Sequence, residues 1–127
     1  MGVDATLMVL HRHGLDDRGA FVAHVLSLQR ERDLWEHFRG MEGGRDLPML
    51  QLPHGSWSGF SDGHEPTHPE GMEERGYLMT DCYDEGFRRF PVTSLPGPEA
   101  SNSSLNRSIL SFVHFNFSDH EVVVFWW

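Results

Sequence analysis

The chain contains no lysine, only one cysteine and no long apolar run, and these absences limit what the protein can be. All ten basic residues are scattered arginines, which is typical of a GC-rich genome rather than of a dedicated anion site. Cys82 has no second cysteine with which to form an intramolecular disulfide. No segment approaches the roughly 20 apolar residues of a membrane-spanning helix, and none resembles a secretory signal. We therefore expect a cytoplasmic protein.

Positive charge is also scarce, since 10 arginines stand against 19 acidic residues. The formal net charge of the 127 residues is therefore −9. Such an excess of acid argues against non-specific binding to nucleic acid or to an anionic membrane. It suits a basic protein partner, and it also serves solubility alone. The length fits one domain, and 39% apolar residues are enough for one core. We therefore expect a single domain over residues 1–127.

Two segments at opposite ends of the chain have strand patterns. Residues Val3–His13 alternate between two faces, which is a strand pattern. Residues Glu121–Trp127 carry apolar side chains on both faces, which is typical of a strand inside a sheet. We therefore expect both ends of the chain to lie in one sheet.

Helical spacing marks two further segments. Arg30–Arg39 has an apolar stripe, and Gly40 is suited to end the helix. Leu105–Phe115 also has helical spacing, although its β-rich second half leaves a strand as the alternative. The apolar residues that define these two stripes are Leu34, Trp35 and Phe38 in the first segment and Leu105, Ile109, Phe112 and Val113 in the second.

The remaining elements are less certain in type. Ala20–Leu28 fits a strand or the start of a helix; we favour a strand, with Ser27 as a candidate helix N-cap. Tyr77–Tyr83 and Phe87–Thr93 fit a hairpin, in which Pro91 would place the second strand at a sheet edge. Together these elements predict an α+β domain with a mostly antiparallel sheet and two helices.

Between them lies a long irregular segment, Arg39–Gly76, which holds eight of the 13 glycines. A polar connection of this length in a small domain is either disordered or functional. Trp57 and Phe60 are its large aromatic residues. They fit two interpretations equally well: a binding anchor for a partner, or a plug that holds the loop to the body.

The same segment contains His64-Glu65-Pro66-Thr67-His68, which has the letters of a zinc-protease motif. That motif works on a helix, and Pro66 argues against a helix here. A looser loop site remains, in which Asp62, His64 and His68 bind zinc or another transition metal. With Glu65 as the base, such a site would define a metal-dependent hydrolase. A solvated loop is the alternative interpretation.

Other polar residues carry weaker indications. His11 and His13 share one strand face and could flank a cleft or a metal. Asp81, Asp84 and Glu85 cluster on the predicted hairpin, where charged residues are usually solvated. Cys82 lies in an alternating row that predicts packing, and the sequence shows no base that would activate its thiol.

Three segments resemble parts of a group of small uncharacterised bacterial and phage proteins. These are Met1-Gly-Val-Asp4, Thr80–Phe87, and Asn106–Leu110 leading to Glu121–Trp127. Proteins of this group begin Met-Gly-x-Asp and end in an apolar strand. Many have a histidine two residues after that aspartate, whereas this chain has Thr6. The resemblance implies a compact α+β fold and no established activity.

These observations lead to two functional hypotheses. The first is a small acidic, non-enzymatic domain that binds another protein as an inhibitor, immunity or accessory protein. The second is a metal-binding domain or metal-dependent hydrolase that uses the 62–68 loop. The acidic charge and the aromatic loop favour the first, and the histidine cluster favours the second.

Overall fold

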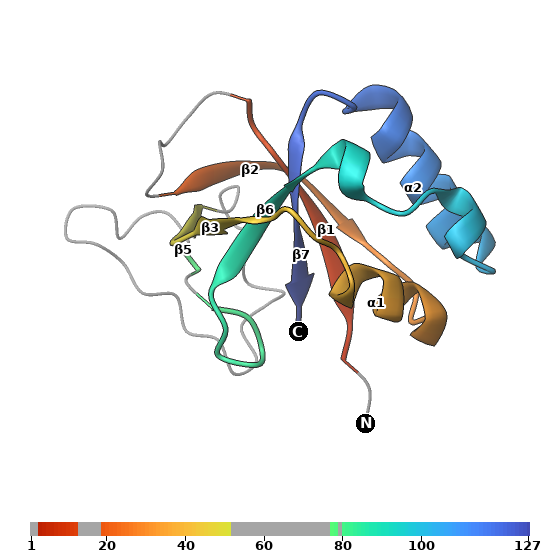
Figure 1. Ribbon diagram of the computed structural model, residues 1–127, viewed down its shortest axis with the longest axis horizontal. Helices are drawn as coiled ribbons and strands as arrows, with labels where there is room; N and C mark the ends of the chain where they lie inside the picture. Colours follow the sequence, from red (N-terminus) through yellow and green to blue (C-terminus); the bar gives the residue numbers. More distant parts are fainter. Residues whose placement is uncertain (1–2, 13–18, 52–76, 79) are drawn as a thin grey trace.

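The structure is a computed structural model that describes residues 3–12, 19–51, 77–78 and 80–127 (Figure 1). Two α-helices and seven β-strands lie in these ranges, which confirms the predicted α+β class. In chain order they are β1 (Ala5–Leu10), β2 (Ala20–Ser27), α1 (Arg32–Arg39), β3 (Arg45–Leu47), β4 (Leu50–Gln51), β5 (Tyr77–Leu78), β6 (Phe87–Pro91), α2 (Ser104–Asn116) and β7 (Glu121–Trp126). Two short 3-10 turns, Val92–Ser94 and Pro98–Ala100, connect β6 to α2.

The strands form one sheet in the order β3-β6-β7-β1-β2-β4-β5. The first and last strands are neighbours at its centre, where Leu7 pairs with Val124 in an antiparallel register. Both predicted terminal strands therefore lie in the same sheet. Among the described strands only β2 and β4 pair in parallel, and all other pairs are antiparallel.

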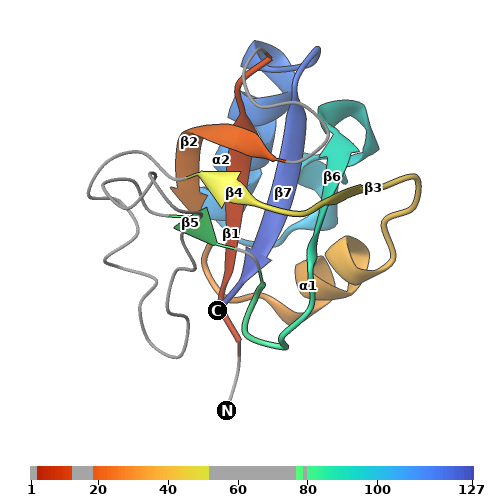
Figure 2. The same ribbon diagram turned by 90° about the vertical axis from the view of Figure 1, so that its left-hand side faces the viewer.

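The sheet curls into a small barrel because β3 and β4 connect its two sides. Only Pro48 and Met49 separate these strands, yet β3 pairs with β6 while β4 pairs with β2. The chain from residue 45 to residue 51 therefore crosses from one side of the sheet to the other, in front of β1 and β7 in Figure 2. This crossing encloses the inner face of the sheet.

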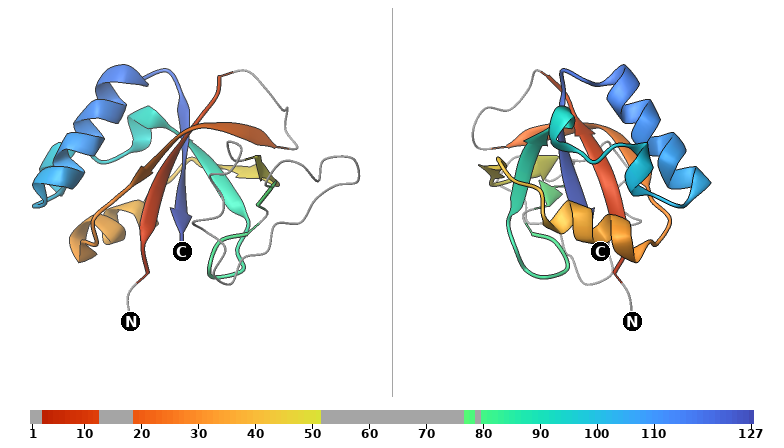
Figure 3. Two further views of the ribbon diagram at one scale, coloured as in Figure 1. Left: turned by 180° about the vertical axis from the view of Figure 1, so that it is seen from behind. Right: turned by 45° about the vertical axis from the view of Figure 1, so that its right-hand side comes forward.

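Two apolar clusters occupy the two faces of the curled sheet. Alternate side chains of β1 and β7 point into the barrel, and the intervening ones point to the helices, as expected for extended strands. Both helices lie over the outer face (Figure 3). Buried apolar residues of the inner cluster include Met8, Leu10, Phe87, Val123 and Phe125, and those of the outer cluster include Leu7, Val9, Leu34, Phe38, Leu110 and Val113. The two-sided burial explains why β7 is apolar on both faces.

The helix α1 forms where its apolar stripe predicts it. Leu34, Trp35 and Phe38 are buried, and the Gly40 N–H donates to the Glu36 carbonyl over 3.1 Å at the helix end. The helix begins later than expected, with Glu31 rather than Ser27 at the N-cap position. Ser27 instead ends β2, which settles residues 20–27 as a strand. The prediction of a Ser27 cap was therefore wrong.

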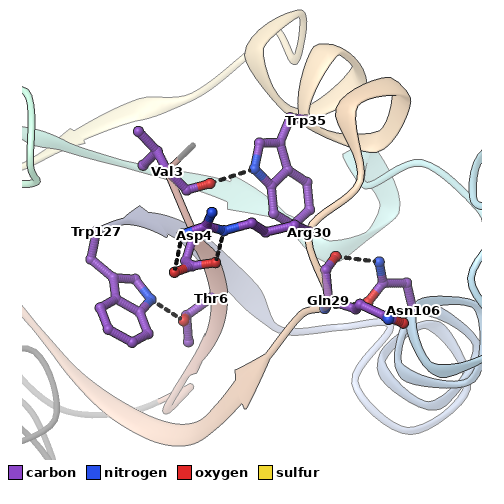
Figure 4. Close-up of polar contacts among 8 residues, drawn as sticks. All are labelled: Val3, Asp4, Thr6, Gln29, Arg30, Trp35, Asn106 and Trp127. Atoms are coloured by element: carbon purple, nitrogen blue, oxygen red, sulfur yellow. Dashed lines mark hydrogen bonds and ion pairs between the residues drawn. The ribbon is translucent and has the colours of Figure 1, made fainter. Parts of the chain in front are cut away.

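A buried amide explains why residues 28–31 remain outside the helix. Asn106 on α2 is fully buried and bonds both backbone groups of Gln29: its Oδ1 accepts from the N–H over 2.8 Å, and its Nδ2 donates to the carbonyl over 2.7 Å. The same Nδ2 lies 3.1 Å from a Glu31 carboxylate oxygen. These bonds fix the linker between β2 and α1 onto the start of α2 (Figure 4).

Glu31 adds to these contacts, and we call Gln29, Glu31 and Asn106 together the Asn106 latch. Its carboxylate accepts hydrogen bonds from the Ser101 hydroxyl, the Asn102 N–H and the Asn106 amide. Partial burial raises the pKa of Glu31, and the hydrogen bonds together outweigh that effect and hold its pKa below the usual value. The ionised carboxylate therefore stabilises the fold above its ordinary pKa, and this contribution is lost as the pH falls through its lowered value.

Three expectations for the other elements need correction. The strand β6 is not at an edge, since it lies between β3 and β7; β3 pairs with it only as far as Arg89, so Pro91 needs no N–H partner on that side. Residues 45–51 form two short strands within the segment predicted to be irregular. On α2, the buried face is formed by Asn106, Leu110 and Val113, whereas Leu105 and Phe112 are exposed.

Candidate functional site

The loop residues predicted from the sequence lie outside the described residues. These are Trp57 and Phe60 for binding, and Asp62, His64 and His68 for metal. Within the described ranges, no three His, Cys, Asp or Glu side chains are grouped so that they could hold a metal ion. His11 is exposed, and its expected companion His13 lies outside the description. The candidate site must therefore be built from other side chains.

A short hairpin at residues 80–86, closed by a bridge between Thr80 and Gly86, precedes β6 and presents one aromatic ring at its tip. The longer hairpin predicted from the sequence is wrong, because β5 pairs with β4 and not with β6. Asp81 is buried at 6% exposure, and its Oδ1 accepts the N–H groups of Tyr83 (2.8 Å) and Glu85 (3.2 Å). Asp84 takes a left-handed conformation with φ of 56°, which closes the turn. The Asp81 carboxylate is thus used inside the turn, and Tyr83 is left 47% exposed on a well-fixed tip.

Arg39, the last residue of α1, joins this tip to the sheet. Its Nη2 donates to the Tyr83 hydroxyl over 2.9 Å, and its guanidinium carbon lies 5.0 Å from the Trp126 ring centre and 5.9 Å from the Tyr83 ring centre. Guanidinium groups at such distances are attracted to aromatic faces. We call Arg39, Tyr83 and Trp126 the Arg39 platform.

Further aromatic residues support the platform from below. The Trp126 ring packs edge-on against Trp35 and Phe38, with centre distances of 5.8 Å and 6.3 Å. The indole N–H of Trp35 donates to the Val3 carbonyl over 2.7 Å (Figure 4). The platform therefore rests on a buried aromatic layer with a fixed orientation.

The two chain ends are tied together beside this layer. Asp4 and Trp127 exchange backbone hydrogen bonds of 2.8 Å and 2.9 Å, and the Trp127 indole donates to the Thr6 hydroxyl over 2.8 Å. Asp4 also accepts from Arg30 over 2.7 Å and 3.2 Å (Figure 4). These hydrogen bonds from Arg30 lower the pKa of Asp4. Asp4 thus links β1 to the residues before α1.

A hollow lies on each side of the platform, each of about 460 Å³. Arg39 lines both of them. One also contains Met41, Arg88 and Phe90, and the other contains Val3, Glu36 and Tyr83. Arg39 thus separates the two hollows and the half-exposed Tyr83 ring borders one of them, which suits contact with side chains of another molecule.

The cysteine of this hairpin does not form a reactive site. Burial and the neighbouring Asp81 charge raise the pKa of the Cys82 thiol, so the thiolate is disfavoured at neutral pH. Its backbone N–H donates to the Trp126 carbonyl over 3.0 Å and attaches the hairpin to β7. The geometry thus gives Cys82 a structural place, and it offers no nucleophile at the platform.

Comparisons with protein-family models, with curated proteins and with solved structures found no match. The resemblance to small bacterial and phage proteins therefore stays a prediction. None of the helices in the described ranges is both long and apolar enough to cross a membrane.

Proposed function

We propose that the chain is a small, non-enzymatic protein-binding domain of the inhibitor, immunity or accessory kind, which contacts its partner through the Arg39 platform. The supporting observation is that Tyr83, half exposed, is held by Arg39, which lines a hollow on each side of itself. Trp, Tyr and Arg are the residue types that supply most of the energy of protein interfaces. A ring that is already fixed loses little conformational entropy on binding.

Charge around the platform indicates a basic partner. Glu36, Asp84 and Glu85 are exposed around the Arg39 platform beside Arg32 and Arg88, and the excess of acid over the whole chain gives a net charge of −9. The one guanidinium in the platform is already engaged with Tyr83 and Trp126. A basic protein would therefore meet attractive charge around an aromatic anchor, and its association should slow as salt increases.

The test is a binding measurement on a matched pair of variants. The immobilised wild-type chain is used to isolate a partner from an extract of the organism that encodes it, and the purified pair is titrated calorimetrically. We expect Tyr83→Ala to weaken binding by about 2 kcal/mol, or roughly 30-fold. Tyr83→Phe keeps the ring and should cost less. Neither variant should lower the melting temperature much, because the ring is half exposed.

Two results would contradict this proposal. One is a partner that binds wild type and Tyr83→Ala with equal affinity. The other is an extract in which wild type and an Arg39→Ala/Tyr83→Ala double variant retain the same proteins in the same amounts. Either would show that the platform is not the recognition surface.

The metal hypothesis leads to a separate expected result. The chain, purified without a histidine tag, should contain no stoichiometric metal, and its melting temperature should not respond to zinc or to a chelator. A ligand that binds only the native state raises stability by linkage, so a real site would shift the melt. Bound zinc that disappears in a His64→Ala/His68→Ala variant would instead support the metal-dependent alternative.

A further inference from the structure

The helix α2 has a second apolar face that no other element of the described ranges covers. Its inner face is buried through Asn106, Leu110 and Val113. On the opposite side Leu105, Phe112 and Phe115 are 52%, 46% and 87% exposed. In Figures 1 and 3 the helix lies at the outside of the molecule.

The exposed residues follow a coiled-coil spacing. Leu105 and Phe112 are seven residues apart, and Ser108 and Phe115 repeat that interval three residues later. This is the a and d pattern by which one helix packs along another. We call these four residues the α2 stripe.

We propose that the α2 stripe is the interface of a symmetric dimer, in which α2 of a second copy of this chain packs antiparallel. A shallow hollow of about 1010 Å³ lies beside the stripe; Ser108, Phe112 and Phe115 line it together with Pro98 and Ser111, and Leu105 lies outside it. The same surface thus carries a protruding ring and the small residues that can receive it. A two-fold dimer requires such a self-complementary surface.

Charge also favours a second copy on this face. Although the chain is strongly acidic, α2 contains no Asp or Glu. Arg107 lies in its first turn, and Asp119 follows its last turn with a 57% exposed side chain. Because Asp119 already pairs with Arg12 of its own chain over 2.9 Å, it adds no unbalanced negative charge at this end of α2, and an antiparallel partner opposes the two helix dipoles. Two acidic chains can therefore approach here without the repulsion expected elsewhere.

The first test is sedimentation of the untagged full chain over a range of concentrations. We expect a concentration-dependent dimer, and we expect Phe115→Asp to raise its dissociation constant about 30-fold or more. Thermal unfolding confirms that the variant is folded, and Phe115→Ser serves if the charged variant is not. Tyr83→Ala, which removes another exposed ring, is the control and should dimerise like wild type.

Cross-linking tests the antiparallel arrangement. In a Cys82→Ser background, Leu105→Cys and Asn116→Cys chains are mixed and oxidised. Identical positions in an antiparallel pair are roughly 15–18 Å apart along the axis, too far for a disulfide, whereas residue 105 faces residue 116. We expect the mixed disulfide to predominate. A parallel pair would cross-link each variant to itself and would overturn the proposed geometry.

A typical dimer of this kind has a dissociation constant of about 1 μM. A wild-type chain that stays monomeric at about ten times that concentration would overturn the proposal. So would a dimer that Phe115→Asp leaves intact. The proposed partner binding is tested independently, because Phe115→Asp should retain it and Tyr83→Ala should lose it. A failure of either proposal can therefore be told from a failure of the other.

Discussion

A chain that ends at Val123 should not fold. Deleting Val124–Trp127 removes the part of β7 that pairs with Ala5–Leu7 at the centre of the sheet. It also removes Phe125, the largest fully buried side chain among the described residues, whose ring centre lies 5.7 Å from that of Phe87 inside the barrel. Loss of such a ring alone costs about 3–5 kcal/mol, against a total stability of about 5–15 kcal/mol for a typical domain. The measurement is thermal unfolding by circular dichroism, which should show no cooperative transition.

Point variants separate the buried ring from the rest of the deletion. Phe125→Ala should lower the free energy of unfolding by about 3–5 kcal/mol in urea titrations. At chain concentrations low enough for the monomer to predominate, Phe115→Ser removes a ring that is 87% exposed and should change it by less than about 0.5 kcal/mol. A truncated chain that melts cooperatively at the wild-type temperature would show that the end of β7 is dispensable.

The central strands and α1 could be predicted because their local patterns are unambiguous. β1 and β7 have the spacing of two-sided strands, and the stripe of Leu34, Trp35 and Phe38 fits only a helix. In each case burial follows the period of the element. Local pattern and tertiary packing agree in these segments, so the sequence alone is informative.

The closure of the barrel could not be predicted in this way. β3 and β4 contain three and two residues, which is too short to show any period. Their pairing depends on partners far along the chain, such as Arg45 with Arg89. Glu121 accepts from both of these arginines over 2.8 Å and 3.1 Å and fixes β3 beside β6. Such contacts become visible only once the strands are placed.

The buried face of α2 was misjudged because a polar residue occupies it. A hydrophobic pattern assigns Leu105 and Phe112 to the core and Asn106 to solvent. Asn106 is buried because the linker at Gln29 offers it two backbone partners, which no helical pattern encodes. The buried face of α2 is therefore rotated about the helix axis by about one residue from the predicted face, which leaves the α2 stripe exposed.

The candidate site was missed for a related reason. Arg39 and Tyr83 are 44 residues apart in the sequence. Arg39 ends α1 and Tyr83 lies at the tip of a turn, and neither belongs to a recognisable sequence motif. Their residue types were the available signal, because Arg and Tyr at an exposed position are common in interfaces. Only the fold shows that Arg39, at the end of α1, reaches both the Tyr83 ring and the Trp126 ring.

The Asn106 latch leads to the second large effect. Asn106→Ala should lower the free energy of unfolding by about 2–4 kcal/mol, because it leaves both Gln29 backbone groups without these partners beside a fully buried position. It also removes one hydrogen bond to Glu31. The measurement is urea unfolding at neutral pH. A loss below about 0.5 kcal/mol, the size of an ordinary surface substitution, would contradict the role of the latch.

Asn106→Asp tests the same latch with almost no change of shape. Its carboxylate can still accept from the Gln29 N–H, but it cannot donate to the Gln29 carbonyl, and at neutral pH it repels Glu31. We expect a loss at least as large as that of Asn106→Ala at pH 7. Because protonation of either carboxyl relieves the repulsion, the difference from wild type should shrink as the pH falls toward 4. Asn102→Ala is the matched control: Asn102 meets Glu31 through its backbone N–H, so this variant should remain close to wild type at every pH.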